Sequence, residues 1–196
     1  MLDFMGHAAE SPAISPAEYL TWEREQDSKH EYHLGEVFAM SGGSPRHNYL
    51  STAIQAELRA ALRGTGCRVF SSDQRISAKA GERYVYSDAV VTCGETRLEP
   101  GTNDVLANPK IVVEVLSQST AAYNRGEKWE AYQRLPSLTD YLLVSQTAKQ
   151  IEHFQREDDG SWRYRLLEAG ETIKLSGGAL VAIDAVYEGA FDLAAD

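Results

Sequence analysis

Two short apolar runs of this chain each carry one carboxylate. Asp88 lies within residues 86–91 and Glu114 within residues 111–116, among valine, isoleucine, leucine and alanine. Continuous apolar runs of this length are typical of strands buried on both faces. An ionised carboxylate buried there is costly unless a cation meets it. With Lys128 on the segment that follows, the pattern predicts a site that holds a divalent metal ion and activates water.

Each acid also has a structural interpretation. Asp88 could cap a turn or pair with an arginine, and Glu114 could form a buried ion pair with a lysine, although such pairs add little net stability. Because side chains alternate along a strand, Glu114 is expected on the face opposite Val113 and Val115.

Lys128 is the third candidate. Asn124, Lys128 and Tyr132 recur every four residues, so a helix would place them on one face. Near a bound metal, a lysine can orient water or help to deprotonate it, and it can offset charge that develops on a phosphate. The alternative is a lysine on a solvated helix surface.

Three hydroxyl residues precede that helix. Ser117, Ser119 and Thr120 are expected to cap its first turn, and their hydroxyls could also contact a substrate phosphate at the helix N-terminus.

An outer set of candidates lies earlier in the chain. Glu31 or Glu36 could reach the same metal, and His47, near the start of a predicted helix, could contact phosphate or a carboxylate. Acids on a surface hairpin are otherwise simply solvated.

The pattern of the whole chain predicts one α/β domain, with a central mixed β-sheet flanked by helices, over residues 15–196 after a loose tail at residues 1–14. We expect helices at residues 15–26, 47–62 and 120–134, and a hairpin over residues 31–40. Further strands are expected at residues 68–76, 84–92, 111–116, 140–145, 150–156, 162–167 and 180–183. Residues 96–108 are expected to form a loop, and a turn is expected from Asp184.

The composition bounds the function classes. A net charge of −10 weighs against a tight, nonspecific DNA-binding protein, unless the charge is segregated. Six basic residues do fall close together: Arg59, Arg63, Arg68, Arg75, Lys79 and Arg83.

The chain shows no transmembrane run and no secretory signal, so we expect a cytoplasmic protein that does not enter membranes. Cys67 and Cys93 are expected to be plain buried thiols, with a disulfide or redox pair as the alternative.

Several of these residues together resemble the Uma-type family of predicted endonucleases, which belongs to the restriction-endonuclease-like PD-(D/E)xK superfamily. The resemblance covers about residues 15–185 and is most specific at Glu114-Val115-Leu116-Ser117. The matching positions are Glu31, Gly35, Glu36, His47, Asp88, Glu114, Ser117, Ser119, Thr120, Lys128, Tyr132 and the segment 136–144.

The resemblance implies a restriction-endonuclease-like fold and a Mg²⁺- or Mn²⁺-dependent cleavage of phosphodiester bonds in nucleic acid, with DNA as the expected substrate. It implies metal binding by Asp88 and Glu114, with Lys128 and Glu31 completing the catalytic set. A homodimer would suit cleavage of two strands.

The chain departs from the family pattern at four positions. Leu116 stands where the superfamily has its lysine, and Lys128 resembles the family's substitute. Ser87 replaces a proline, Leu34 replaces a frequent aspartate, and Asn124 replaces an aspartate four residues before the lysine. The acidic net charge and the loss of the carboxylate at position 124 favour the alternative of a catalytically inactive binding module. A phosphatase or nucleotide hydrolase is a third class, but the chain has no P-loop and no GxSxG motif.

Overall fold

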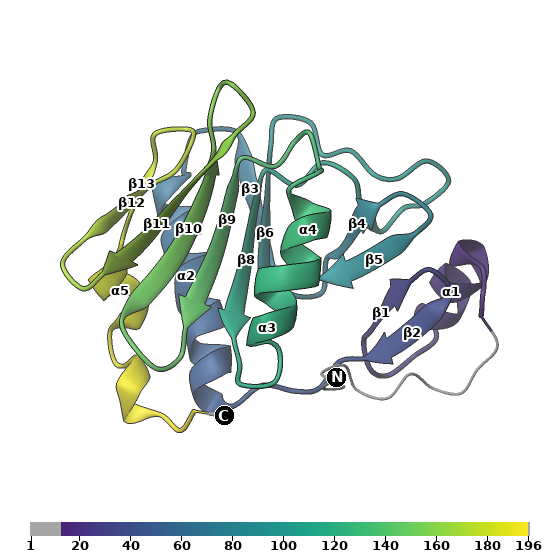
Figure 1. Ribbon diagram of the computed structural model, residues 1–196, viewed down its shortest axis with the longest axis horizontal. Helices are drawn as coiled ribbons and strands as arrows, with labels where there is room; N and C mark the ends of the chain where they lie inside the picture. The colour runs from purple at the N-terminus through teal and green to yellow at the C-terminus, as the bar shows by residue number, and fades with distance from the viewer. Residues whose placement is uncertain (1–12, 196) are drawn as a thin grey trace.

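The computed structural model describes residues 13–195, in which two main β-sheets are joined by a few helices (Figure 1). The expected tail at residues 1–14 lies outside the described residues except for its last two positions. In the part of the chain that is described, no helix is long and apolar enough to cross a membrane.

The larger sheet has six strands in the order β11-β10-β9-β8-β6-β3. Their bounds are Trp162–Glu168 (β11), Gln150–Arg156 (β10), Asp140–Ser145 (β9), Ile111–Leu116 (β8), Ala89–Cys93 (β6) and Cys67–Phe70 (β3). Strands β8 and β9 are parallel and the other neighbours are antiparallel. The sheet is therefore mixed, as the sequence predicts.

The smaller sheet has five strands in the order β2-β1-β5-β4-β7. Their bounds are Glu36–Ala39 (β2), His30–His33 (β1), Arg83–Tyr86 (β5), Arg75–Lys79 (β4) and Val105–Leu106 (β7). The predicted hairpin is confirmed as β1 and β2. Its two-residue turn has positive φ at Leu34 (50°) and Gly35 (97°), which matches the twist of the two strands.

Helices cover both faces of the larger sheet (Figure 1). Helix α2 (Pro45–Ala61) packs on one face through Leu50, Ile54 and Leu58. The segment formed by α3 (Ala121–Tyr123), the π-helical turn η1 (Asn124–Lys128) and α4 (Trp129–Tyr132) crosses the other face. This second segment lies between the two sheets, so its side chains can reach both of them.

Five shorter elements complete the domain. Helix α1 (Pro16–Glu23) begins at Ser15 with the predicted capping box, and it packs on the smaller sheet. Strands β12 (Thr172–Lys174) and β13 (Leu180–Ala182) pair with each other. They are followed by α5 (Ile183–Tyr187) and the 3₁₀ turn η2 (Ala190–Asp192).

Two of the predicted strands are wrong because each of them divides between the two sheets. Residues 84–92 form the end of β5 and most of β6, with a bend at Ser87 and Asp88. Residues 68–76 divide in the same way between β3 and β4. Asp88 therefore lies where the chain passes from one sheet to the other, instead of inside a strand.

Other predicted boundaries also need correction. The regular helix expected at residues 120–134 contains a π-helical turn, where the Tyr141 hydroxyl donates to the Asn124 carbonyl at 3.0 Å. A side chain that bonds a helix carbonyl in this way disturbs the regular hydrogen-bond ladder. The loop at residues 96–108 contains β7, β12 was not predicted, and the turn expected from Asp184 is helix α5.

The expectation of plain thiols is wrong, and the disulfide alternative is correct: Cys67 and Cys93 are bonded to each other. They lie directly opposite each other on β3 and β6, a pairing that depends on the sheet register. The bond closes a loop between residues separated by 26 positions.

We predict that reducing this bond lowers the free energy of unfolding by about 3 kcal/mol, because the unfolded chain regains the entropy of an open loop of that length. Urea unfolding with and without reductant measures the difference. The double variant Cys67→Ser/Cys93→Ser should be as stable as the reduced protein and insensitive to reductant. Alkylation of both cysteines in the folded, unreduced protein would contradict the prediction.

Candidate active site

Asp88 and Glu114 lie opposite each other at the junction of the two sheets. The register of β6 and β8 pairs Ala89 with Val113, and one further step places Asp88 against Glu114. Asp88 is close enough for its charge to raise the pKa of the Glu114 carboxyl. The Asp88 Oδ2 atom also accepts a hydrogen bond of 2.7 Å from the backbone amide of Val115. The two predicted metal ligands are therefore neighbours.

Glu114 projects away from helix α2, as the alternation along β8 predicts. Val113 and Val115 belong to the core beneath α2, whereas Val112 and Leu116 belong to the core beneath α4. The Glu114 carboxylate is buried, and it lies on the same face of the sheet as Val112 and Leu116.

Lys128 meets Glu114 from the π-helical turn. Its Nζ lies 3.1 Å from Glu114 Oε1 and donates to the backbone carbonyl of Tyr86 at 2.7 Å. Only 5% of its side chain is exposed, so the alternative of a solvated lysine is wrong. Tyr132 donates its hydroxyl to the same Glu114 oxygen, and Asn124 is also buried.

Glu31 reaches this cluster from strand β1 of the smaller sheet. Its Oε1 atom lies 2.8 Å from the Lys128 Nζ and accepts the Tyr86 amide at 3.2 Å. Its Oε2 atom accepts the Tyr123 hydroxyl at 2.8 Å. Both oxygens are thus engaged, and Glu31 holds Lys128 in place. Glu36, the other candidate acid of the hairpin, is exposed.

The charges of the cluster are strongly coupled. Burial raises the pKa of Glu114 to about 8; Lys128 opposes the shift, and the neighbouring Asp88 and Glu31 carboxylates add to it. Burial alone would lower the pKa of Lys128, but Glu114 and Glu31 outweigh that effect and raise it. Lys128 therefore stays charged at neutral pH, and Glu114 binds a proton at a higher pH than an ordinary glutamate does.

His47 lies at the edge of the cluster, in the first turn of α2. Its Nε2 atom is 3.6 Å from Asp88 Oδ2, which agrees with the predicted carboxylate contact. Its Nδ1 atom is buried and has no hydrogen-bond partner among residues 13–195. The N-cap of the helix is Ser44, whose hydroxyl accepts the His47 amide at 3.2 Å.

The hydroxyl residues lie just beyond Glu114 on the chain. Ser117 Oγ accepts the Thr120 amide at 3.1 Å and shares hydrogen bonds with the hydroxyls of Ser119 and Thr120. These contacts close the turn into α3.

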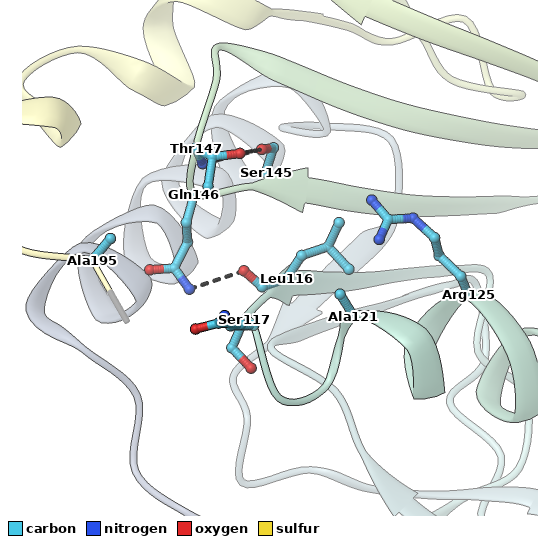
Figure 2. Close-up of a pocket in the computed structure, with 9 residues that line it drawn as sticks. Leu116, Ser117, Ala121, Arg125, Ser145, Gln146, Thr147 and Ala195 are labelled. Atoms are coloured by element: carbon cyan, nitrogen blue, oxygen red, sulfur yellow. Dashed lines mark hydrogen bonds between the residues drawn. The ribbon is translucent and has the colours of Figure 1, made fainter. Parts of the chain in front are cut away.

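A pocket of about 430 Å³ opens beside this turn, at the ends of the parallel strands β8 and β9. Figure 2 shows Leu116 and Ser117 on its wall, with Gln146 turned toward the Leu116 carbonyl and Arg125 on the other side. Arg125 forms an ion pair with Glu152. A crevice at the carboxyl ends of parallel strands is a common place for a ligand.

Comparison with known proteins identifies the family. A family model described as "Putative restriction endonuclease" (Uma2) matches residues 16–185. Two uncharacterized proteins of Synechocystis sp. are similar to this chain along most of their length. One, slr1290, is 38% identical over 183 residues, which cover 93% of this chain and 95% of that protein. The other, sll1609, is 30% identical over 154 residues, which cover 79% of this chain and 87% of that protein.

The chain belongs to the Uma2 family. The resemblance stated from the sequence is thus confirmed. A crystal structure from Anabaena variabilis, titled as "a putative nuclease belonging to DUF820", aligns with a TM-score of 0.73 at 13% identity. The alignment covers 90% of this chain and 99% of the other, so the two share a fold, and the expected fold class is confirmed.

In this Uma2 chain, the free oxygens of the acid pair fit a divalent cation. No group of three or more histidine, cysteine or acidic residues suited to a metal occurs among residues 13–195. Asp88 Oδ1 and Glu114 Oε2, however, accept no hydrogen bond from any residue in that range. Mg²⁺ commonly binds through one or two carboxylates and completes its shell with water and phosphate. The donor chemistry of these two oxygens is of the kind that Mg²⁺ and Mn²⁺ prefer.

The sequence did not reveal the supporting groups of this Uma2 site. Tyr123 and Tyr132 donate hydroxyl hydrogen bonds to Glu31 and Glu114 at 2.8 Å and 3.2 Å. The sequence marked Tyr132 as a neighbour of Lys128 on the helix and as a family position, but not as a partner of Glu114. Tyr123 gave no signal, because its contact with Glu31 joins residues 92 positions apart.

We predict that Lys128→Met destabilises the protein by about 3 kcal/mol, because it leaves buried carboxylates without their ammonium. The folded pKa of Glu114, about 8, lies above its ordinary value of 4.5. Its contribution to stability is therefore complete below about pH 4.5 and is lost as the pH rises through 8. Without Lys128 this loss grows, so the destabilisation should be larger at about pH 9 than at about pH 5.

Denaturant unfolding at both pH values measures the effect. The control is Lys149→Met, because Lys149 is an exposed residue that pairs with Asp184 at 3.5 Å. It should change the free energy of unfolding by less than about 1 kcal/mol at either pH. Equal losses of unfolding free energy for the two variants would contradict the prediction, because the buried network would then contribute no more than an exposed ion pair.

Proposed function

We propose that this protein is an endonuclease that hydrolyses phosphodiester bonds of DNA with Mg²⁺ or Mn²⁺. The observation that carries the proposal is the buried Lys128 ammonium. It lies 3.1 Å from Glu114 and 2.8 Å from Glu31, and Asp88, just before β6, is the acid next to Glu114. The match to a restriction-endonuclease family supports the same chemistry.

The contacts of each side chain indicate its role in the proposed reaction. Asp88 and Glu114 would hold the metal through their free oxygens, and the ion would supply an activated water and an electrophile for the phosphate. Lys128 carries a permanent positive charge, so it offsets charge on the phosphate and orients water, and it does not act as a base. Glu31 is a positioning residue, because both its oxygens are engaged in fixing Lys128 and its surroundings.

The groups around the cluster suit a nucleic-acid strand. His47 beside Asp88 would contact the phosphate that reacts. Ser117, Ser119 and Thr120 would bind an adjacent phosphate next to the pocket of Figure 2. We further propose a homodimer, since two sites are needed to cut both strands, and a cytoplasmic location, where such a substrate is found.

One observation favours a second candidate, an inactive module that binds a partner through the same fold. Glu31, Glu114, Lys128 and the Tyr86 carbonyl already satisfy one another in a closed network. Such a network needs no metal. The net charge of −10 and the presence of Asn124 in place of an acid point the same way. Metal-dependent cleavage separates the two candidates.

We predict that the purified protein nicks supercoiled plasmid DNA with Mg²⁺ or Mn²⁺ and not with EDTA. Asp88→Asn, Glu114→Gln and Lys128→Met should each lower the rate at least about 100-fold, because each removes a charge from the reacting centre. The initial rate of nicking on agarose gels measures the effect.

The control is Asp158→Asn, which removes an acid from an exposed turn far along the chain and should leave the rate unchanged. Circular dichroism would establish that every variant is folded. Wild-type protein that fails to cut with either metal, or cutting that persists in Asp88→Asn, would contradict the proposal.

A further inference from the structure

The six basic residues between positions 59 and 83 separate into two groups in the structure. Three of them are paired with acids. Arg75 lies 3.1 Å from Asp104, Arg83 lies 3.1 Å from Glu127, and Lys79 contacts Glu82. These pairs belong to the smaller sheet and its surroundings. Their charge is already compensated.

The remaining three, Arg59, Arg63 and Arg68, are exposed, and none forms an ion pair with any residue in the range 13–195. They gather at one groove of about 380 Å³, between the end of α2 and strand β3. The lining residues are Arg59, Leu62, Arg63, Gly64, Cys67, Arg68, Val69 and Phe70. No acid lines the groove, although the chain has 29 acidic and only 19 basic residues.

The groove is built into the fold and does not consist of loose surface side chains alone. Arg68 donates to the Gly94 carbonyl at 3.0 Å, which fixes its guanidinium beside the groove. The Cys67–Cys93 disulfide joins β3, the last strand of the sheet, to β6. Three guanidinium groups, two at the end of α2 and one from β3, suit a ligand with regularly spaced charges.

We propose that this groove binds the phosphate backbone of DNA at a distance from the reacting centre. The inference rests on the proposed function for its ligand class. Uncompensated arginines that share one groove repel each other and attract a polyanion, and arginine is well suited to phosphate.

Helix α2 connects the groove to the candidate active site. His47, in its first turn, lies 3.6 Å from Asp88, and Arg59 follows twelve residues later. Twelve residues of α-helix span about 18 Å. Since duplex DNA rises about 3.4 Å per base pair, the groove would hold phosphates roughly five base pairs from the bond that is cut. The arginines therefore govern DNA binding and not the chemical step.

The test measures how the affinity for a 5′-labelled duplex of about 20 base pairs depends on salt. Fluorescence anisotropy is recorded in EDTA, which prevents cleavage, with wild type and the triple variant R59Q/R63Q/R68Q. The slope of log K against log salt should fall by about 2 to 3, because up to three phosphate contacts are lost. Affinity at low salt should fall more than about tenfold.

The matched control is R134Q/R163Q/R165Q, which changes the net charge equally. Each of these exposed arginines already has an acidic partner. The slope of log K against log salt for this control variant should equal that of wild type. If cleavage is observed, R59Q/R63Q/R68Q should raise KM and leave kcat unchanged.

Equal slopes for the two triple variants would overturn the proposal. If the slopes are equal and R59Q/R63Q/R68Q self-associates, the arginines instead serve to prevent the edge strand β3 from pairing with another molecule. The outcome is separable from that of the proposed function. A protein that does not cut DNA can still show the difference in slope, and a protein that cuts DNA can lack it.

Discussion

The buried ammonium of Lys128 is the contact on which the architecture of the site depends. It brings together Glu31 of the smaller sheet, Glu114 of the larger sheet and the carbonyl of Tyr86 at the end of β5. A charge removed from water is tolerated only where opposite charges and hydrogen bonds replace the lost solvation. The two sheets and the segment between them must therefore keep one relative arrangement. The same requirement fixes Asp88, because the chain bends there on its way from β5 to β6.

The balance of charge explains why the site suits a cation. Glu31 and Glu114 share the ammonium of Lys128, Asp88 adds a third negative charge next to Glu114, and His47 lies at the edge of the group. The excess of negative charge, together with burial, raises the pKa of Glu114 to about 8. A proton relieves the excess in the metal-free protein. A divalent ion between Asp88 and Glu114 would relieve it more fully, and would do so at the place where a phosphate group could complete its coordination.

Local sequence signals predicted much of the fold and the identity of the central residues. The capping box at Ser15, the hairpin around Gly35 and the alternation around Glu114 depend on neighbours in the chain, so they could be recognised without the structure. The break at Asp88 could not, because apolar residues continue on both sides of it. The π-helical turn and the disulfide also depend on partners from distant segments, Tyr141 and the opposing strand. Glu31 was recognised as a candidate, but its contact with Lys128 required the packing of the two sheets.

The most direct test of this account is a crystal of the protein soaked in Mn²⁺ and measured at the manganese absorption edge. The account predicts an anomalous peak coordinated by Asp88 and Glu114, with Lys128 still bound to Glu31. Density with no peak at that position under saturating Mn²⁺, and with the network of Lys128 unchanged, would contradict it.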